Sequence, residues 1–285
     1  MTYREWYQTG EEKLHRAGID EAGLDARLLL EFVCGTDRNT LLVHGDRPLS
    51  ITEQEQYRTA LERRANHIPL QQITGIQNFM GLDFLVNEHV LIPRQDTEVL
   101  VEEVLKNLHD GMGILDMCTG SGCILISLLH YSNDCHGVGV DLSAEALEIA
   151  EENAGKLLGK RQEQSERAGT VSFLQSNLFE KVTGKYEVIV SNPPYIRPDV
   201  IKTLMPEVRE HEPMMALDGG TDGLDFYRKI TEQSREYLTG GGMLFFEIGY
   251  DQSHAVVELM QAAGFKQIRV VKDYAGLDRV VYGTK

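Results

Sequence analysis

Basic residues are scarce in this sequence. The 285 residues include 28 lysines and arginines against 44 aspartates and glutamates, which gives a formal net charge of −16. Proteins that hold nucleic acid through its phosphates normally present a basic face, because each neutralised phosphate releases counterions. The charge balance therefore argues against direct nucleic-acid binding and favours a partner that is not a polyanion, such as a basic protein surface.

Cysteine is rare as well, and no two cysteines form a C-x-x-C pair. The four are Cys34, Cys118, Cys123 and Cys135. The simplest interpretation is reduced thiols in the cytosol, with neither a disulfide framework nor a metal site. No apolar run approaches the length of a membrane span, and the first residues carry acidic side chains in place of the apolar core of a signal peptide. We therefore expect a cytoplasmic protein with no membrane partner.

The first seventy residues predict a small helical domain, 1–70. Apolar side chains recur there at helical spacing, and turn-forming stretches at Gly18–Asp20 and Gly45–Pro48 separate the pieces. Residues 71–95 predict a linker with a short hairpin around Gly81. The apolar positions behind these predictions are Leu24, Leu28, Leu29, Phe32, Val33, Tyr57 and Leu61 in the helices, and Phe79, Leu82, Phe84 and Val86 in the hairpin.

From Asp96 to the end, 96–285, strands and helices alternate. A first helix is expected over 96–108, and further helices over 123–130, 143–158 and 254–263. Strands are expected at 114–117, 137–140, 171–174, 186–190 and 243–248, followed by a terminal hairpin at 268–273 and 279–284. The alternation indicates a parallel sheet with helices on both faces, with the hairpin placing one antiparallel strand at the end. The charged run 160–169 is interpreted as a solvated loop.

A glycine-rich turn, residues 115–123, joins the first strand of the α/β region to its first helix. Gly120 and Gly122 let a ligand approach the backbone, and the helix N-terminus offers free N–H groups. Asp141 follows about twenty residues later, at the end of the second strand, where an acid can accept both hydroxyls of a ribose. The pattern fits either a dinucleotide or an adenosyl ligand that carries a carboxylate.

Two details favour S-adenosylmethionine over a nicotinamide cofactor. The turn reads D-x-x-x-G-x-G from Asp116, unlike the G-x-G-x-x-G fingerprint, and no acid or base for hydride transfer is evident. Asp116 could orient the turn or interact with the ammonium of a methionyl group. Cys118 and Cys123 are interpreted as small buried residues, because no histidine or lysine near them in sequence would activate a thiolate.

The tetrapeptide Asn192-Pro193-Pro194-Tyr195 directly follows the fourth expected strand. In an open α/β sheet this end of the strands forms the ligand crevice, so the tetrapeptide should face the glycine-rich turn. The Asn192 side-chain oxygen and the Pro193 carbonyl can grip the N–H bonds of a planar amide or exocyclic amine while Tyr195 packs against it. Such acceptors stabilise the positive charge that develops on nitrogen during methyl transfer, and no strong base is needed.

Several stretches together resemble one family, the release factor glutamine methyltransferases (the PrmC/HemK family), over nearly the whole length. The matching stretches are DARLLLEFV (25–33), PLQQITG (69–75), FMGLDFLVN (79–87), LIPRQDTE (91–98), DMCTGSG (116–122), DLSAEALEIAEENA (141–154), SNPPYI (191–196), EPMMALDGGTDGLDFYRKI (212–230) and EIGYDQ (247–252). The resemblance implies a class I, Rossmann-like methyltransferase fold: a mostly parallel seven-stranded sheet with a terminal antiparallel hairpin, preceded by a small helical domain.

The resemblance also implies the reaction. S-adenosyl-L-methionine would methylate N5 of the glutamine in the Gly-Gly-Gln motif of class-1 peptide chain release factors, leaving S-adenosyl-L-homocysteine, and we expect the enzyme to act as a monomer. The helical domain, 1–70, would help dock the release factor. Residues 91–98 would border the active site, with Arg94, Thr97 and Glu98 candidates for shaping it.

The site residues implied by the resemblance fall into two groups. The residues expected to bind the cofactor are Cys118, Thr119, Gly120, Ser121, Gly122, Asp141, Asn177, Leu178 and Asn192. The residues expected to hold the substrate amide are Asn192, Pro193, Pro194 and Tyr195, of which Asn192, Pro193 and Tyr195 are the catalytic candidates. Asn177 and Leu178 would border the adenine.

Three positions depart from the family pattern. Cys118 replaces a glycine, Gln95 a proline, and Asn177 a common aspartate. Competing hypotheses are a methyltransferase for a ribosomal-protein glutamine, a nucleic-acid amino methyltransferase, a binding module that has lost activity, and a nicotinamide oxidoreductase. Residues 212–223, after the tetrapeptide, are either an ordinary loop or a lid over the site.

Overall fold

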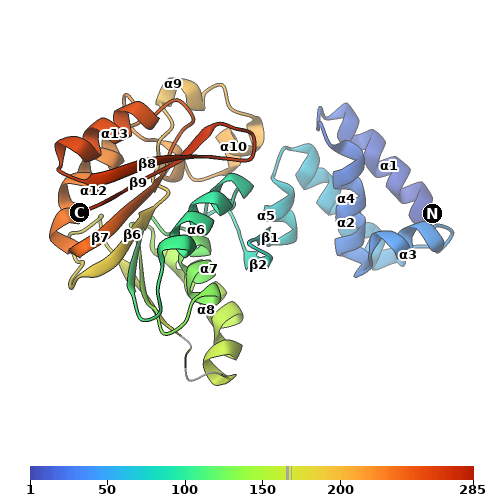
Figure 1. Ribbon diagram of the computed structural model, residues 1–285. Coiled ribbons are helices and arrows are strands. Elements are labelled where there is room, and N and C mark those ends of the chain that lie inside the picture. Colours follow the sequence, from blue (N-terminus) through green and yellow to red (C-terminus); the bar gives the residue numbers. More distant parts are fainter. Residues whose placement is uncertain (165–166, 168) are drawn as a thin grey trace. The chain divides into compact units, whose positions relative to one another are not determined.

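The computed structural model describes residues 1–164, 167 and 169–285, and the chain forms two compact units (Figure 1). The first unit comprises Met1–Ile76 together with Met205–His211, and the second comprises Gln77–Leu204 and Glu212–Lys285. The sequence pattern places residues 205–211 in the α/β region, whereas in the structure they belong to the helical unit. Among the described residues, no helix is long and apolar enough to span a membrane.

The helical unit is built of helices, as the sequence predicts for residues 1–70. They are α1 (Tyr3–Arg16), α2 (Ala22–Cys34), α3 (Arg38–Val43), α4 (Ile51–Ala65), α5 (Leu70–Thr74) and the later α10 (Pro206–His211). Thr2 and Ser50 cap α1 and α4, each in a reciprocal bond pair with the glutamate three residues on. Trp6 and Tyr57 meet edge to face inside the core, and the Tyr57 hydroxyl donates to the Ala26 carbonyl at 2.9 Å.

A buried charge network holds α10 in the helical unit. The Arg64 guanidinium donates to Asp25 at 2.6 Å and to Glu207 at 3.0 Å, and all three side chains are nearly buried. His67 lies 3.2 Å from the same Glu207 oxygen, and Gln72 donates to the main-chain carbonyl of the last residue of α10 at 2.8 Å. Because these contacts join residues about 140 positions apart, the local pattern of the sequence could not show that α10 belongs to this unit.

The second unit begins with a two-stranded hairpin and continues as an α/β domain. The hairpin strands are β1 (Ile76–Phe79) and β2 (Leu82–Leu85), as expected around Gly81. Its helices are α6 (Gln95–Asn107), α7 (Cys123–Tyr131), α8 (Ala144–Gln164), α9 (Pro198–Ile201), α11 (Met214–Leu217), α12 (Asp225–Tyr237) and α13 (Ser253–Ala262). Its sheet strands are β3 (Gly113–Met117), β4 (His136–Asp141), β5 (Thr170–Gln175), β6 (Tyr186–Ser191), β7 (Leu238–Glu247), β8 (Lys266–Lys272) and β9 (Asp278–Thr284).

The seven sheet strands lie in the order β5-β4-β3-β6-β7-β9-β8. Pairs from β5 to β7 are parallel, whereas β9 is antiparallel to both of its neighbours. The expected mostly parallel sheet with a terminal hairpin is confirmed. One detail differs: the antiparallel strand lies one position inside the edge, because β9 pairs with β7 and leaves β8 outermost. Strand order reverses between β3 and β6, which places the ligand crevice of such a sheet at their carboxyl ends.

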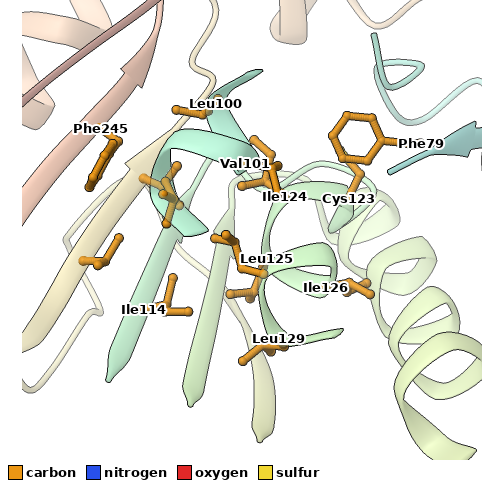
Figure 2. Close-up of a cluster of buried hydrophobic side chains, with 14 of the residues drawn as sticks. Phe79, Leu100, Val101, Ile114, Cys123, Ile124, Leu125, Ile126, Leu129 and Phe245 are labelled. Carbon is orange, nitrogen blue, oxygen red and sulfur yellow. The ribbon is translucent and has the colours of Figure 1, made fainter. Parts of the chain in front are cut away.

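Successive strand residues supply two separate cores, one on each face of the sheet. Ile114, Val188 and Phe245 pack with α6, α7 and α8, whereas the next residue along each strand packs with α12 and α13 on the other face. Figure 2 shows the first core, where Leu100 and Val101 of α6 and the apolar side chains of α7 gather over Ile114 and Phe245. The helix α7 is buried almost all round, as expected for an apolar segment between a sheet and a neighbouring helix.

Two parts of the α/β unit differ from the sequence expectation. The helix α8 continues to Gln164, so the first half of the charged run 160–169 is helical, and residues 165, 166 and 168 of the expected loop lie outside the described residues. No helix is predicted at α12 from the sequence. Its buried face consists of Tyr227, Ile230, Thr231 and Ser234, of which half are polar, and most of its other residues are charged, so the segment does not stand out in the sequence as an apolar stretch.

Replacing Arg64 by alanine should strongly destabilise the helical unit. The change leaves the carboxylates of Asp25 and Glu207 buried without their cation, which costs about 3–5 kcal/mol. Trp6 is the only tryptophan and is buried in this unit, so its fluorescence during denaturant unfolding reports on this unit. The matched control is Arg16→Ala, which removes an exposed pair with Glu12 and should cost less than about 0.5 kcal/mol. Equal losses in the two variants would contradict the prediction.

Candidate active site

The site is built around one pair of neighbouring residues on adjacent strands in the middle of the sheet. Met117, the last residue of β3, pairs with Ser191, the last residue of β6, and the Ser191 hydroxyl donates to the Met117 carbonyl at 2.6 Å. The glycine-rich turn begins at the next residue of one strand, and the Asn-Pro-Pro-Tyr tetrapeptide begins at the next residue of the other. The structure therefore brings the two strongest sequence signals to the same edge of the sheet.

Left-handed backbone shapes the glycine-rich turn. Cys118, Gly120 and Gly122 have φ values of 63°, 55° and 78°. A β-carbon on Gly122 would lie 2.8 Å from Ile126 and 3.2 Å from Ala150, so glycine is needed there for close packing of the helices. A β-carbon on Gly120 would have no heavy atom within 4 Å. Gly120 therefore presents bare backbone to open space, as a ligand-binding turn requires.

Asp116 orients the turn from beneath. Its side chain is fully buried, and the Thr119 hydroxyl donates to its Oδ2 at 2.6 Å. Burial raises the pKa of Asp116 to about 7, and the hydrogen bond from Thr119 opposes that rise. Asp116 is absent from the cavity wall described below. Of the two roles left open by the sequence, orientation of the turn is the one that this geometry supports.

Asp141, at the end of β4, links the turn to the next helix. Its carboxylate accepts from the Gly120 N–H at 2.9 Å and from the Ser143 N–H at 3.0 Å. Burial raises its pKa, and these backbone donors act in the opposite direction. A carboxylate has about four acceptor positions, so acceptor capacity remains for hydroxyl groups of a ligand. Asp141 lines the cavity and can accept such bonds.

Asn153 of α8 is a supporting residue that sequence reasoning missed. Its fully buried amide accepts from the Leu85 N–H at 2.7 Å and donates to the Leu85 and Ser121 carbonyls at 3.1 and 3.0 Å. One side chain thus ties the hairpin and the glycine-rich turn to α8. The available signal was a polar residue at a helix position that otherwise continues the buried face of Ala146, Ala150 and Ala154.

The tetrapeptide is held by polar contacts on both sides. Asn192 Nδ2 donates to Thr97 Oγ1 at 3.4 Å, and the Tyr195 hydroxyl donates to Glu247 Oε1 at 3.5 Å. Burial raises the pKa of Tyr195, and the nearby carboxyl of Glu247 raises it further, so the phenol stays protonated. Gln252 Nε2 donates to the Tyr195 carbonyl at 3.0 Å. Pro193 and Pro194 are buried.

Residues 212–220 form part of the wall of the site. Glu212 is buried, and both of its carboxylate oxygens lie 2.7 Å from one Arg94 nitrogen. The Ile196 N–H donates to the Leu217 carbonyl, and the Gly219 N–H donates back to the Ile196 carbonyl, both at 2.9 Å. A β-carbon on Gly219 would lie 2.5 Å from the Tyr195 backbone, so only glycine allows this approach. Residues 212–220 are therefore an ordered part of the cavity wall, hydrogen-bonded to Ile196, the residue that follows the tetrapeptide.

These elements enclose a cavity of about 570 Å³. Of the residues expected from the sequence, its wall contains Cys118, Gly120, Asp141, Asn177, Leu178, Asn192 and Pro194. The other expected site residues do not line the cavity: Thr119, Ser121, Gly122, Pro193 and Tyr195. Wall residues that the sequence did not single out are His89, Val90, Met117, Val140, Leu142, Ser143, Ala146, Ser176, Asp225, Phe226 and Lys229, while Pro213, Met214, Met215, Ala216, Asp218 and Gly220 come from the candidate lid.

Arg94, Thr97 and Glu98 lie outside the cavity wall. Leu91 of the segment 91–98 lines the cavity, whereas Glu98 accepts from the Met80 N–H at 2.7 Å and so fixes the hairpin turn. Burial raises the pKa of the Cys118 thiol, and that of Cys123 to about 12, so neither is a nucleophile. Within the described residues, no three His, Cys, Asp or Glu side chains are grouped to hold a metal ion.

Comparison with known proteins gives matches across both units. A family model described as the PrmC N-terminal domain matches residues 5–75, and one described as the methyltransferase small domain matches residues 94–208. A protein of Caulobacter vibrioides named release factor glutamine methyltransferase is 41% identical over 287 residues, covering 100% of this chain and 97% of that protein. One of the same name from Geobacter sulfurreducens is 42% identical over 272 residues, covering 95% and 92%.

A solved structure supports the fold. A methyltransferase from Pyrococcus furiosus matches with a TM-score of 0.54 at 18% identity, covering 79% of this chain and 98% of that one. At this identity the match shows a shared fold alone.

Asp116→Asn should make the protein less sensitive to rising pH. The raised pKa means that folded Asp116 keeps its proton between about pH 4 and 7 while the unfolded chain loses it, so wild-type stability falls as pH rises through this window. Asparagine can still accept from Thr119 and has no proton to lose. Melting temperatures measured from pH 5 to 8 should therefore fall less in Asp116→Asn, by a few degrees, than in wild type or in a control variant of exposed Asp251. Parallel curves for wild type and Asp116→Asn would rule out this ionisation as the cause.

Proposed function

We propose that this chain, which belongs to the family of release factor glutamine methyltransferases, methylates N5 of the glutamine in the Gly-Gly-Gln motif of class-1 peptide chain release factors. The methyl donor would be S-adenosyl-L-methionine, with S-adenosyl-L-homocysteine as the product. The observation that carries the proposal is the common wall of one cavity: Asn192 of the tetrapeptide lies in it together with Gly120 and Asp141. The enzyme would act in translation termination as a cytoplasmic monomer.

The residues of the cavity fit an adenosyl cofactor. Gly120 leaves its backbone open to the space, and Asp141 retains acceptor capacity for the two ribose hydroxyls. Val140, Leu178 and Ala146 supply apolar surface for a purine. Asn177 donates its Nδ2 to Glu180 at 2.7 Å, which leaves its oxygen as an acceptor for an exocyclic amino group. The asparagine at this position therefore keeps the acceptor that an aspartate would provide.

The tetrapeptide performs the substrate side of the reaction. When bound, the cofactor supplies an electrophilic methyl group on a positively charged sulfur. Asn192 Oδ1 and the Pro193 carbonyl would accept the two N–H bonds of the glutamine amide and hold its nitrogen toward that methyl group. Preorganised oxygen acceptors stabilise the positive charge that grows on this nitrogen, and fixed geometry supplies the rest of the rate increase. The product nitrogen then loses a proton readily, so no strong base is required.

Recognition of the protein partner would fall to surfaces outside the cavity. The helical unit matches the PrmC N-terminal domain, and we assign it the docking of the release factor. The net charge of −16 suits a partner surface that is not a polyanion. A nucleic-acid base would have to be taken out of its stack to reach the tetrapeptide, and neither the charge nor the family favours such a substrate.

Labelled methyl transfer tests the proposal directly. Purified class-1 release factor should take label from S-adenosyl-L-methionine, and a factor with its motif glutamine changed to alanine should take none. Duplex DNA and ribosomal protein are assayed in parallel. Label on either of these, with none on the release factor, would overturn the substrate assignment while leaving the chemistry intact.

Asn192→Ala should reduce methyl transfer by at least about 100-fold, because it removes an acceptor aimed at the developing charge. Cofactor affinity, measured by calorimetry, should change little, since Gly120 and Asp141 remain in the wall. The matched control is Asn107→Ala at the end of α6, outside the cavity wall, which should behave as wild type. Near-normal turnover in Asn192→Ala would refute its catalytic role.

A further inference from the structure

Thr97 lies between the catalytic tetrapeptide and a buried acid. It belongs to the first turn of α6, and its side chain is 2% exposed. Its hydroxyl oxygen accepts from Asn192 Nδ2 at 3.4 Å, and the same hydroxyl lies close enough to the carboxyl of Glu247, at the end of β7, to lower the pKa of that acid. Three elements that are distant in sequence therefore meet at one hydroxyl group.

The number of protons that Thr97 and Glu247 carry decides which group donates in each of these two contacts. Glu247 is 2% exposed; the Tyr195 hydroxyl donates to its Oε1 at 3.5 Å, and its Oε2 has no hydrogen-bond partner among the described residues. An ionised carboxyl can only accept, so the single proton of the Thr97 hydroxyl must go to Glu247. The oxygen of Thr97 is then left to accept, and the group of Asn192 that can donate to it is Nδ2.

Because the Asn192 amide is planar, the bond from its Nδ2 to Thr97 also decides which of its atoms faces the cavity. With Nδ2 turned to Thr97, Oδ1 points away from Thr97 on the other branch of the same planar amide, and Asn192 forms part of the cavity wall. Within the described parts of the chain, no donor is bonded to this oxygen. The rotated amide would instead present an NH₂ group to the NH₂ group of the substrate, and two donors cannot form a hydrogen bond.

We propose that Thr97, oriented by Glu247, is a positioning residue that holds the Asn192 amide with its oxygen toward the substrate nitrogen. This inference rests on the proposed function, because it assigns the orientation of a group whose role is to accept from the glutamine amide. Thr97 and Glu247 act through Asn192.

The contacts that run from Glu247 through Thr97 to Asn192 are called the relay below. The ionisation state of Glu247 should control it. Burial raises the pKa of Glu247 to about 7, and the hydrogen bond from Thr97 and the charge of Arg279 act against that rise. Below this pH the protonated carboxyl can itself donate to Thr97, whose proton is then free to turn toward Asn192 and favour the rotated amide. The charged and titratable groups that face Glu247 are Asp96 of α6, Cys123 of α7, Tyr195 after β6, Tyr227 of α12 and Arg279 of β9.

The test compares substitutions that separate the hydroxyl from the shape of residue 97. Thr97→Val keeps the shape and loses the hydroxyl, so kcat should fall about 10- to 100-fold with little change in the KM for cofactor. Thr97→Ser keeps the hydroxyl and should restore kcat to within about threefold of wild type. The matched control is Thr231→Val, since Thr231 is also 2% exposed and its hydroxyl has no partner within the described residues. Wild-type kcat in Thr97→Val, or equal losses in Thr97→Val and Thr97→Ser, would overturn the inference.

The dependence of kcat on pH distinguishes a residue that positions Asn192 from one that only supports the fold. Wild-type kcat should rise with pH through about 7 as Glu247 ionises. Glu247→Gln carries a permanent donor, so its kcat should stay low and lack this rise. A Glu247→Gln variant with the wild-type profile would contradict the relay.

A nuclear magnetic resonance measurement on the enzyme without substrate tests this inference independently of the proposed function. The side-chain amide proton signals of Asn192, assigned by their absence in Asn192→Ala, should shift with pH around 7 in wild type and lose that dependence in Thr97→Val. Signals insensitive to both pH and the substitution would refute the relay even if the release factor is methylated. A shift that follows the expected pattern, with no label on the release factor, would instead support the relay and overturn the substrate assignment.

Discussion

The register of β3 against β6 is the constraint on which the site depends. Because Met117 pairs with Ser191 and is bonded to its hydroxyl, the glycine-rich turn and the tetrapeptide leave the sheet at neighbouring points. A shift of one residue would turn every side chain of one strand to the other face and expose two apolar cores. Packing on both faces therefore fixes the positions of cofactor and substrate residues relative to each other.

Buried polar groups then set the finer geometry. Asp116 fixes the turn through Thr119, Asn153 fixes it through the Ser121 carbonyl, and Glu247 is linked to Asn192 through Thr97. Each group is costly to bury and is retained where it orients a residue of the site. The site is consequently preorganised by side chains that do not line the cavity, which is the arrangement that electrostatic stabilisation of a transition state requires.

The three departures from the family pattern have physical explanations in the fold. Cys118 has a φ of 63°, a left-handed conformation in which glycine is unstrained, so the usual glycine is understandable and cysteine is tolerated at some cost. Gln95 is the first residue of α6, the position at which proline is favoured because its missing N–H would have no partner. Asn177 keeps an acceptor oxygen because its NH₂ group is bonded to Glu180.

Sequence alone determined the α/β alternation, the terminal hairpin, the turn at Gly120 and the tetrapeptide at Asn192. The spacing of apolar residues sets which local structure forms, and glycine and proline restrict or free the backbone where they stand, so all of these signals are local. Only the tertiary structure assigned α10 to the helical unit, since Arg64 meets Glu207 across 143 positions. It also revealed Asn153 and the position of Glu247 beside Thr97, which come from different strands and helices. Local pattern decides which elements form, whereas the pairing of strands decides which buried polar groups become neighbours, and no short stretch of sequence contains that information.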